Sequence, residues 1–316
     1  MRSGDRGEDA EENQREESAA GGRYDHALVN EMLREFADGW IRCFLRRVGR
    51  VVGEGAARRS GLYFGHHEER STERFMTVAA ADQPLYQLVS GAAPGTIDEV
   101  VQRMESIDEL LPNGDGLKWF NRLYLMVTTE VDLSPPAGGW KDANWLLLLD
   151  VVFAGFYFRV VAGFLSGAST VPSSWNAMLS ARYTAGIDRI QFALAGMNAH
   201  INHDLALALL ATNQQMSLQP DYASPEHADY EAVNDLLNAV MPSALQMLAV
   251  GVLGELAQDT GKTGRILAFW NICRARDLAW GFADHLRGLD DGARQVALAA
   301  QDQLTGALGR AILVCP

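Results

Sequence analysis

Residues 191–209 read QFALAGMNAHINHDLALAL, and this stretch decides the fold. Within an Ala-, Leu- and Phe-rich helical pattern stands a dense polar segment made of Asn198, His200, Asn202, His203 and Asp204. At about 100° per residue, His203 lies about 60° to one side of His200 and Asp204 about 40° to the other, while the two asparagines lie on roughly the opposite face. Polar side chains on two faces of an apolar helix need partners on both sides. The pattern therefore predicts a long helix, over about 185–216, that is surrounded by protein.

Capping signals before this segment predict three earlier helices. Thr96 followed by Glu99 fits a capping box for a helix that ends near residue 111. Asp115 is placed to cap a helix to about 132, and Asp142 to cap a long apolar helix over 143–166. The last of these is long enough to span a bilayer. Because Asp150 and Arg159 interrupt it, and a charge is costly in lipid, we expect a buried core helix and no membrane insertion.

The remaining periodic segments are also helical, and no alternating strand pattern or fixed repeat is present. These helices are expected over 24–59, from Pro172 onward, over 225–259 with a kink or division at Pro242, over 263–286 and over 290–313. Residues 60–75 interrupt the pattern as a loop or short extended element. We therefore predict an all-α protein in which a disordered acidic tail, 1–22, precedes a single multi-helix domain, 23–316, with long buried central helices.

Composition excludes several classes of function. Of the 316 residues, 48% are hydrophobic and 21% are charged, which rules out disorder over most of the length. The net charge of −13 argues against a nucleic-acid partner or a polybasic membrane anchor. The three cysteines are scattered and form no CxxC pair, and residues 1–22 lack the apolar run of a secretory signal, so a cytoplasmic location is expected. A homodimer is compatible with these features.

His200 and Asp204 are the leading candidates for chemistry. An imidazole and a carboxylate four residues apart on a helix form an acid–base pair or bind one metal ion. The alternative is a core histidine that Asp204 merely orients. The pattern is HxxHD and not HExxH, and no ExxH occurs, so a metal is not indicated, and we expect no cofactor. A divalent zinc or non-haem iron held by His200, His203 and Asp204 is the metal alternative.

Other polar and aromatic side chains are candidates for the same cavity. Asp150 lies in the aromatic-rich 143–166 helix, where burial would raise its pKa and suit it to acid–base work, unless it pairs with an arginine such as Arg182 or Arg274. The candidates for contact with a substrate are Asn198, Asn202, Tyr157, Trp175, Arg182 and Gln191. The two asparagines are most simply hydrogen-bonding struts between helices.

Four segments carry a resemblance to a known family. They are DGLKWFNRLYLMVTTEV (115–131), LDVVFAGFYF (149–158), QFALAGMNAHINHDLALAL (191–209) and DYEAVNDLL (229–237). Together they resemble the bacterial family catalogued as domain of unknown function 5995, over roughly residues 92–285. The family's core pattern resembles NAHINxDL, which implies roles for Asn198, His200, Asn202 and Asp204. His203 stands at its variable position, which counts against a metal site that depends on it.

The resemblance implies a helical fold and a site, and no particular reaction. Members resemble orphan proteins of actinobacterial genomes, many of which serve natural-product pathways. We therefore expect a cyclase, lyase or hydrolase that acts on a hydrophobic small molecule by acid–base chemistry, with His200, Asp204 and Asp150 as its catalytic residues. A metal-dependent enzyme and a non-catalytic carrier or interaction protein are the two alternatives.

Overall fold

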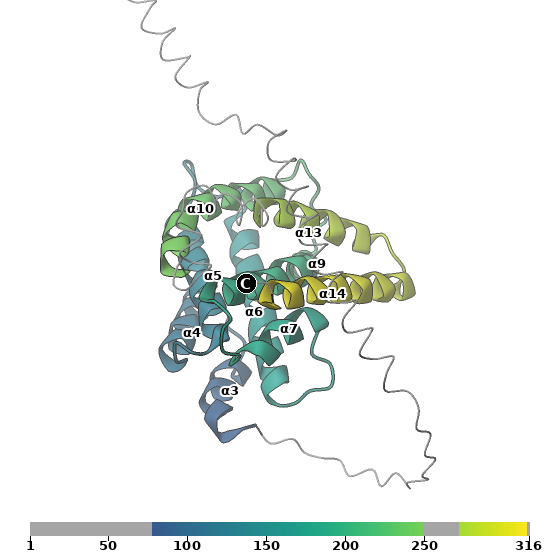
Figure 1. Ribbon diagram of the computed structural model, residues 1–316. Coiled ribbons are helices and arrows are strands. Elements are labelled where there is room, and N and C mark those ends of the chain that lie inside the picture. The colour runs from purple at the N-terminus through teal and green to yellow at the C-terminus, as the bar shows by residue number, and fades with distance from the viewer. Residues whose placement is uncertain (1–77, 249–271, 315–316) are drawn as a thin grey trace, which may run out of the picture. The chain divides into compact units, whose positions relative to one another are not determined.

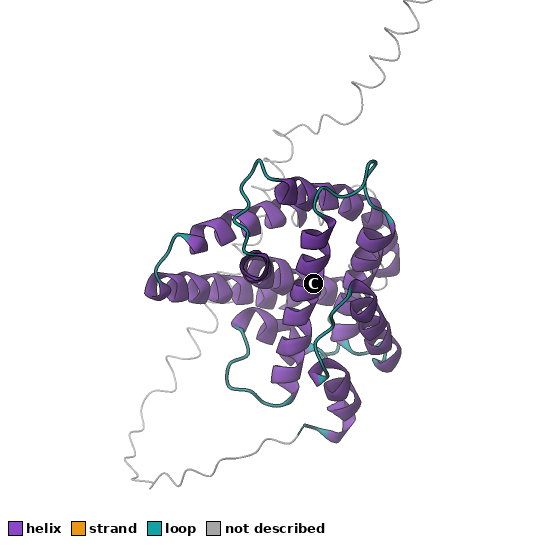
Figure 2. Cartoon of the chain, turned by 180° about the vertical axis from the view of Figure 1, so that it is seen from behind, coloured by secondary structure: helices purple, strands orange, loops and turns teal. Residues whose placement is uncertain are grey.

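The structure, a computed structural model, describes residues 78–248 and 272–314, all of which belong to one compact unit, Thr72–Pro316 (Figure 1). Throughout these two ranges every regular element is a helix, which confirms the predicted all-α class (Figure 2). The predictions for 1–22, 24–59 and 60–75 lie outside the described residues. The elements are η1 (Ala80–Asp82), α3 (Gln83–Ser90), α4 (Ile97–Leu110), α5 (Gly116–Leu133), α6 (Ala143–Leu165), α7 (Ser173–Ala181), α8 (Arg189–Ala199), η2 (His200–Asp204), α9 (Leu205–Met216), α10 (Pro225–Leu248), α13 (Ile272–Arg287) and α14 (Asp291–Val314).

The predicted helix over 185–216 is the centre of the fold, but it is not one uniform α-helix. It begins at Arg189, because Gly186 adopts φ +84° and the side chains of Asp188 and Gln191 form a capping box. A single π-helical turn, η2, then separates α8 from α9. Helices α5, α7 and α14 pack on α8, whereas α6 and α13 pack on α9. The polar segment is thus surrounded by protein, as predicted.

The structure confirms the predicted capping residues of three neighbouring helices. Thr96 Oγ1 accepts from Glu99 N at 3.3 Å, Asp115 Oδ1 from Leu117 N at 3.0 Å, and Asp142 Oδ1 from Trp145 N at 3.0 Å. The Glu99 carboxylate accepts from Gly95 N, the residue before the cap, and not from Thr96 N, so only the Thr96 half of the predicted capping box forms. Each cap satisfies an amide that the first turn of a helix leaves without a partner.

Two glycines allow α5 and α8 to approach each other closely. A Cβ built on Gly196 of α8 would lie 2.5 Å from the ring of Phe120 on α5. A Cβ on Gly116 of α5 would lie 2.3 Å from the ring of Phe192 on α8. The phenylalanine ring of each helix therefore packs directly against the glycine backbone of the other. This contact fixes Phe120 at the centre of the core, where it is fully buried.

Among the described helices, α6 is long and apolar enough to cross a membrane. Half of its most apolar stretch is buried inside the protein. It packs against α3, α9 and α10. Helix α10 continues through Pro242 to Leu248. The rest of the predicted 225–259 helix lies outside the described residues, and so does the start of the predicted 263–286 helix. Helices α7 and α14 agree with the predictions, and Asp290 Oδ1 caps α14 through Ala293 N at 2.8 Å.

Candidate active site

The polar segment coincides with the π-helical turn η2. Leu205 N–H donates to the carbonyl of His200, five residues earlier, in place of the usual four. Single π-helical turns inside α-helices are rare and often lie at functional sites. Here the wider turn holds His200, His203 and Asp204, so the local backbone irregularity and the dense polar sequence mark the same position.

Asp204 is the centre of the hydrogen bonding at this turn. Its Oδ2 lies 3.0 Å from His200 Nδ1 and also accepts from Trp175 Nε1 at 2.8 Å. Its Oδ1 lies 2.7 Å from His203 Nδ1. Burial acts to raise the pKa of Asp204, but hydrogen bonds from the two histidines and their electrostatic attraction lower it overall. Asp204 is therefore a buried carboxylate that holds both imidazoles.

The pKa values of the two histidines are shifted in opposite directions. Burial lowers the pKa of His200, and its hydrogen bond to Asp204 opposes this only in part, so the imidazole is neutral. Burial also acts on His203, but Asp204 and the more distant Asp302, 3.8 Å from Nε2, raise its pKa overall. Because Asp204 accepts from His200 Nδ1, the His200 proton is assigned to Nδ1 and its Nε2 carries a lone pair. Among the described residues, this buried Nε2 has no hydrogen-bond partner.

Aromatic side chains enclose the His200 ring, which is fully buried. Phe153 of α6 stacks on it with ring centroids 3.6 Å apart and an interplanar angle of 5°. Tyr124 of α5 lies edge-on at 4.6 Å. The other rings of this aromatic enclosure, at 5.7 to 6.4 Å, are Phe120, Trp175 and Tyr157. The structure thus brings two predicted residues, Tyr157 and Trp175, to His200.

Asp150 lies near this enclosure, one helical turn before Phe153 on α6. Its Oδ2 is sealed from solvent and has no partner among the described residues, and burial raises its pKa to about 7. The attraction of Arg276 opposes that rise, whereas Arg182 is engaged by Asp115. Tyr124 interacts with both His200 and Asp150. Its ring contacts His200, and burial together with the negative charges of Asp150 and Asp204 raises the pKa of its hydroxyl.

The structure places the other predicted site residues away from the His200 ring. Arg182 binds Asp115 through Nε, at 3.0 and 3.1 Å, and through Nη2 at 2.5 Å, at the start of α5. Gln191 Nε2 donates to Ile312 O at 2.7 Å.

The two asparagines face α14. Asn198 Nδ2 donates to Thr305 O at 2.9 Å, and Asn202 Nδ2 donates to Asn198 Oδ1 at 3.0 Å. The carbonyl of Asn202 accepts from Gln301 Nε2 at 2.8 Å. Asn198 thus acts as the predicted strut between helices, whereas the Asn202 side chain bonds within its own helical segment and only its backbone carbonyl contacts α14.

Sequence reasoning missed three side chains that shape the site. Phe120 and Tyr124, four residues apart on α5, contribute two walls of the enclosure. Their spacing on a capped helix was the available signal. Asp302 of α14 accepts the amides of Ser173 and Ser174 at the start of α7 and faces His203, and no local pattern links positions so far apart.

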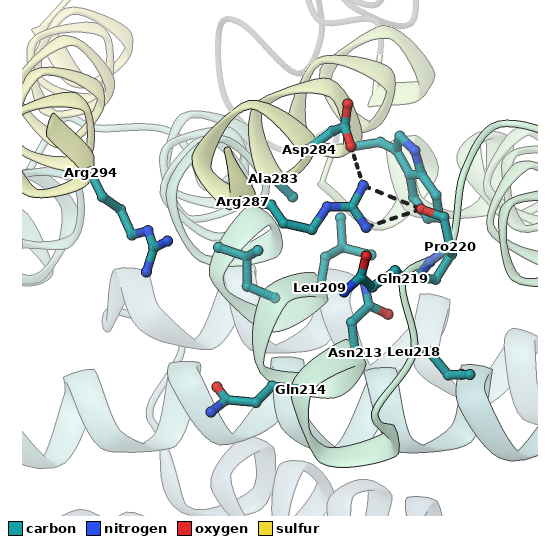
Figure 3. A pocket seen from close by; sticks show the side chains of 12 residues that line it. Leu209, Asn213, Gln214, Leu218, Gln219, Pro220, Ala283, Asp284, Arg287 and Arg294 are labelled. Carbon is teal, nitrogen blue, oxygen red and sulfur yellow. Dashed lines mark hydrogen bonds and ion pairs between the residues drawn. The ribbon is translucent and has the colours of Figure 1, made fainter. Parts of the chain in front are cut away.

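No group of metal-ligating side chains is found around His200 in the described part of the chain. Across residues 78–248 and 272–314, no three His, Cys, Asp or Glu side chains converge as metal ligands do. Between the helices of the polar segment, α6 and α5, where a cavity was expected, aromatic rings lie against His200. A cavity of about 230 Å³ lies elsewhere, between α9 and α13 (Figure 3).

The fold and the site define an all-α protein with a buried Asp–His pair at a π-helical turn. The chain belongs to the Family of unknown function (DUF5995), whose model matches residues 97–315. The match begins with α4 and extends through α14, beyond the resemblance seen over 92–285, and it contains the whole aromatic enclosure. No curated protein and no solved structure matches the chain.

Proposed function

We propose that this protein is an enzyme that transfers protons on a hydrophobic small molecule without a redox cofactor. His200 is its acid–base residue, Asp204 orients His200, and Asp150 is a second acid or base. Cyclisation, elimination and hydrolysis of an intermediate in bacterial natural-product synthesis are the reactions that such groups serve. One observation carries the proposal: Asp204 holds His200 Nδ1, while Nε2 has no hydrogen-bond partner among the described residues.

A purely structural role leaves this unpartnered nitrogen unexplained. A buried acceptor without a hydrogen bond costs about 1–3 kcal/mol, and a phenylalanine in the same enclosure would avoid that cost. In a general base, by contrast, the lone pair must be available for the substrate. The lowered pKa of His200 keeps the imidazole in its basic form. The Asp204 carboxylate would then stabilise the imidazolium that forms when the base takes up a proton.

The walls of the enclosure set the kind of substrate and its route of entry. Aromatic faces favour an apolar or unsaturated molecule over a highly charged one. His200 itself is fully buried, whereas Phe153 is 8% exposed and Tyr124 is 5% exposed. Rotation of these two side chains would open the enclosure on the side where Asp150 lies. Such gating is common in enzymes that exclude water from the reacting groups.

The burial of His200 among five aromatic rings is the observation that favours the non-catalytic alternative. If five rings enclose His200 permanently, the polar turn serves only to fix the register of the central helix. The metal alternative would need His200 and His203 to exchange their hydrogen bonds with Asp204 for bonds to a divalent ion. Metal analysis of protein purified without a His-tag tests that alternative: stoichiometric zinc or iron that is lost from His200→Gln would support it.

A deuterium-exchange assay tests the enzyme proposal without a known substrate. Wild-type protein is incubated in D2O with hydrophobic ketones, esters and thioesters, and mass spectrometry follows C–H exchange, a sign of proton transfer. We expect exchange on a subset of these compounds, and its loss in His200→Gln. His227→Gln, which changes a histidine on α10 outside the enclosure, is the matched control. Equal exchange by a folded His200→Gln protein, or none by the wild type, would count against the proposal.

A further inference from the structure

A second site lies outside the aromatic enclosure, in the cavity between α9 and α13 (Figure 3). Leu209 and Leu210 of α9 form part of its apolar wall, and Trp280 and Ala283 of α13 form the opposite part. Its volume of about 230 Å³ is below the ~300–1,000 Å³ of sites for drug-sized molecules. The cavity is therefore suited to a small ligand with an apolar body.

The charged side chains of this cavity carry a net positive charge. Arg287 and Arg294 line it together with one carboxylate, Asp284. This is unusual in a chain whose net charge is −13, since acidic side chains predominate elsewhere. Arg294 also pairs with Asp291 at 3.7 Å, but that carboxylate is almost fully exposed and does not line the cavity. The lining side chains therefore carry one more positive than negative charge, which favours a monoanion over a dianion.

Both guanidinium groups are held in place by the protein and still have donors available. Arg287 binds Asp284 and donates to Pro220 O at 3.3 and 3.4 Å, but its Nε makes no hydrogen bond to any described residue. Arg294 Nε and Nη2 donate to the carbonyls of Leu286 and Leu289 at 3.0 and 3.1 Å. A guanidinium offers five N–H donors in a rigid fork that matches a carboxylate. Figure 3 shows Arg287 extended across the cavity toward Pro220 and Arg294 on the other side.

An amide donor is oriented beside the arginines. Trp145 Nε1 donates to Asn213 Oδ1 at 2.8 Å, which fixes the amide of Asn213 at the cavity wall. With its oxygen engaged, the Asn213 side chain offers its N–H groups to a ligand. Apolar walls with a few fixed donors are the usual form of a small-molecule site.

We propose that this cavity binds a small amphipathic carboxylate, whose apolar body lies between Leu209 and Trp280 and whose carboxylate is held by Arg287, while Arg294 on the other side of the cavity adds positive charge. Leu209 follows Asp204 by five residues, about 7–8 Å along the helix axis. The site is thus separate from His200, and it stands whether or not His200 is catalytic.

Titration calorimetry with the full chain tests this assignment, using hexanoate as the probe and hexan-1-ol and hexyl phosphate as comparisons. We expect hexanoate to bind at least about tenfold more tightly than hexan-1-ol, because only the carboxylate can accept charge-assisted hydrogen bonds from Arg287. We also expect it to bind more tightly than the dianionic phosphate. Equal affinities for hexanoate and hexan-1-ol, tighter binding of hexyl phosphate, or no binding of hexanoate would each overturn the proposal.

Variants on α13 provide the second readout. Arg287→Gln should weaken hexanoate binding roughly tenfold and leave hexan-1-ol binding unchanged. Arg274→Gln is the matched control, because Arg274 lies on the same helix, pairs with Asp277 at 3.6 Å and lies outside the cavity. Equal effects of the two variants on hexanoate binding would overturn the assignment. The comparison of hexanoate with hexan-1-ol on the wild type decides the question even if Arg287→Gln fails to fold.

Discussion

Replacing Asp150 by asparagine should stabilise the protein at alkaline pH. Burial raises the pKa of Asp150 to about 7 from its ordinary value of 3.8. The folded state therefore holds this proton more tightly than the unfolded state does. The stability that the protonated carboxyl contributes is complete below about pH 4, and it is lost as the pH rises through 7. At about 1.36 kcal/mol per pKa unit, the full loss is at most about 4 kcal/mol, of which about 3 kcal/mol falls between pH 5 and pH 9.

Urea unfolding at these two pH values measures the effect. Asparagine cannot ionise, so Asp150→Asn escapes the loss, and its advantage over the wild type should grow by about 3 kcal/mol from pH 5 to pH 9. Asp235→Asn is the control, since Asp235 is an exposed residue of α10 and its replacement also removes one negative charge. If the advantage of Asp150→Asn is the same at both pH values, Asp150 titrates in its ordinary range and is not suited to acid–base work near neutrality.

Two further substitutions test the packing around the site, both by urea unfolding. Gly196→Ala should destabilise the protein by about 1–3 kcal/mol, because its Cβ would lie 2.5 Å from the buried Phe120 ring. The control, Gly155→Ala, should be neutral or stabilising by up to about 1 kcal/mol, because its Cβ would meet only the flexible end of an arginine side chain. Equal stabilities of the two variants would refute that account. Arg182→Gln should cost about 3–5 kcal/mol, because it leaves the fully buried Asp115 carboxylate without its cation. A cost below about 1 kcal/mol would show that the pair contributes little.

Sequence patterns predicted the parts of the fold that depend on near neighbours. The caps by Thr96, Asp115 and Asp142 follow from hydrogen bonds to amides two or three residues away. The bond between His200 and Asp204 follows from their spacing of four residues. These features were readable because a helix fixes which local side chains can meet.

The remaining features depend on contacts between distant segments. Arg182 was expected near His200 but instead pairs with Asp115, 67 residues earlier, because a buried carboxylate needs a cation. The π-helical turn could not be predicted, since nothing in residues 200–204 distinguishes it from an α-helical turn. The aromatic rings around His200 escaped prediction for the same reason. Phe120 and Tyr124 come from another helix, so the sequence of the central helix does not reveal that they contact His200.

The protonation of His200 is the most direct test of the account. Nitrogen-15 spectra of histidine-labelled full-length protein, recorded from pH 5 to pH 9, distinguish protonated from unprotonated ring nitrogens. We predict that above pH 6.5 His200 is neutral, with its proton on Nδ1 and a free Nε2, while the pKa of His203 lies above the usual 6.5. Replacing Asp204 by asparagine should abolish this preference for Nδ1. A proton on Nε2, or a His200 that remains cationic at neutral pH, would contradict the claim that this nitrogen is an available base.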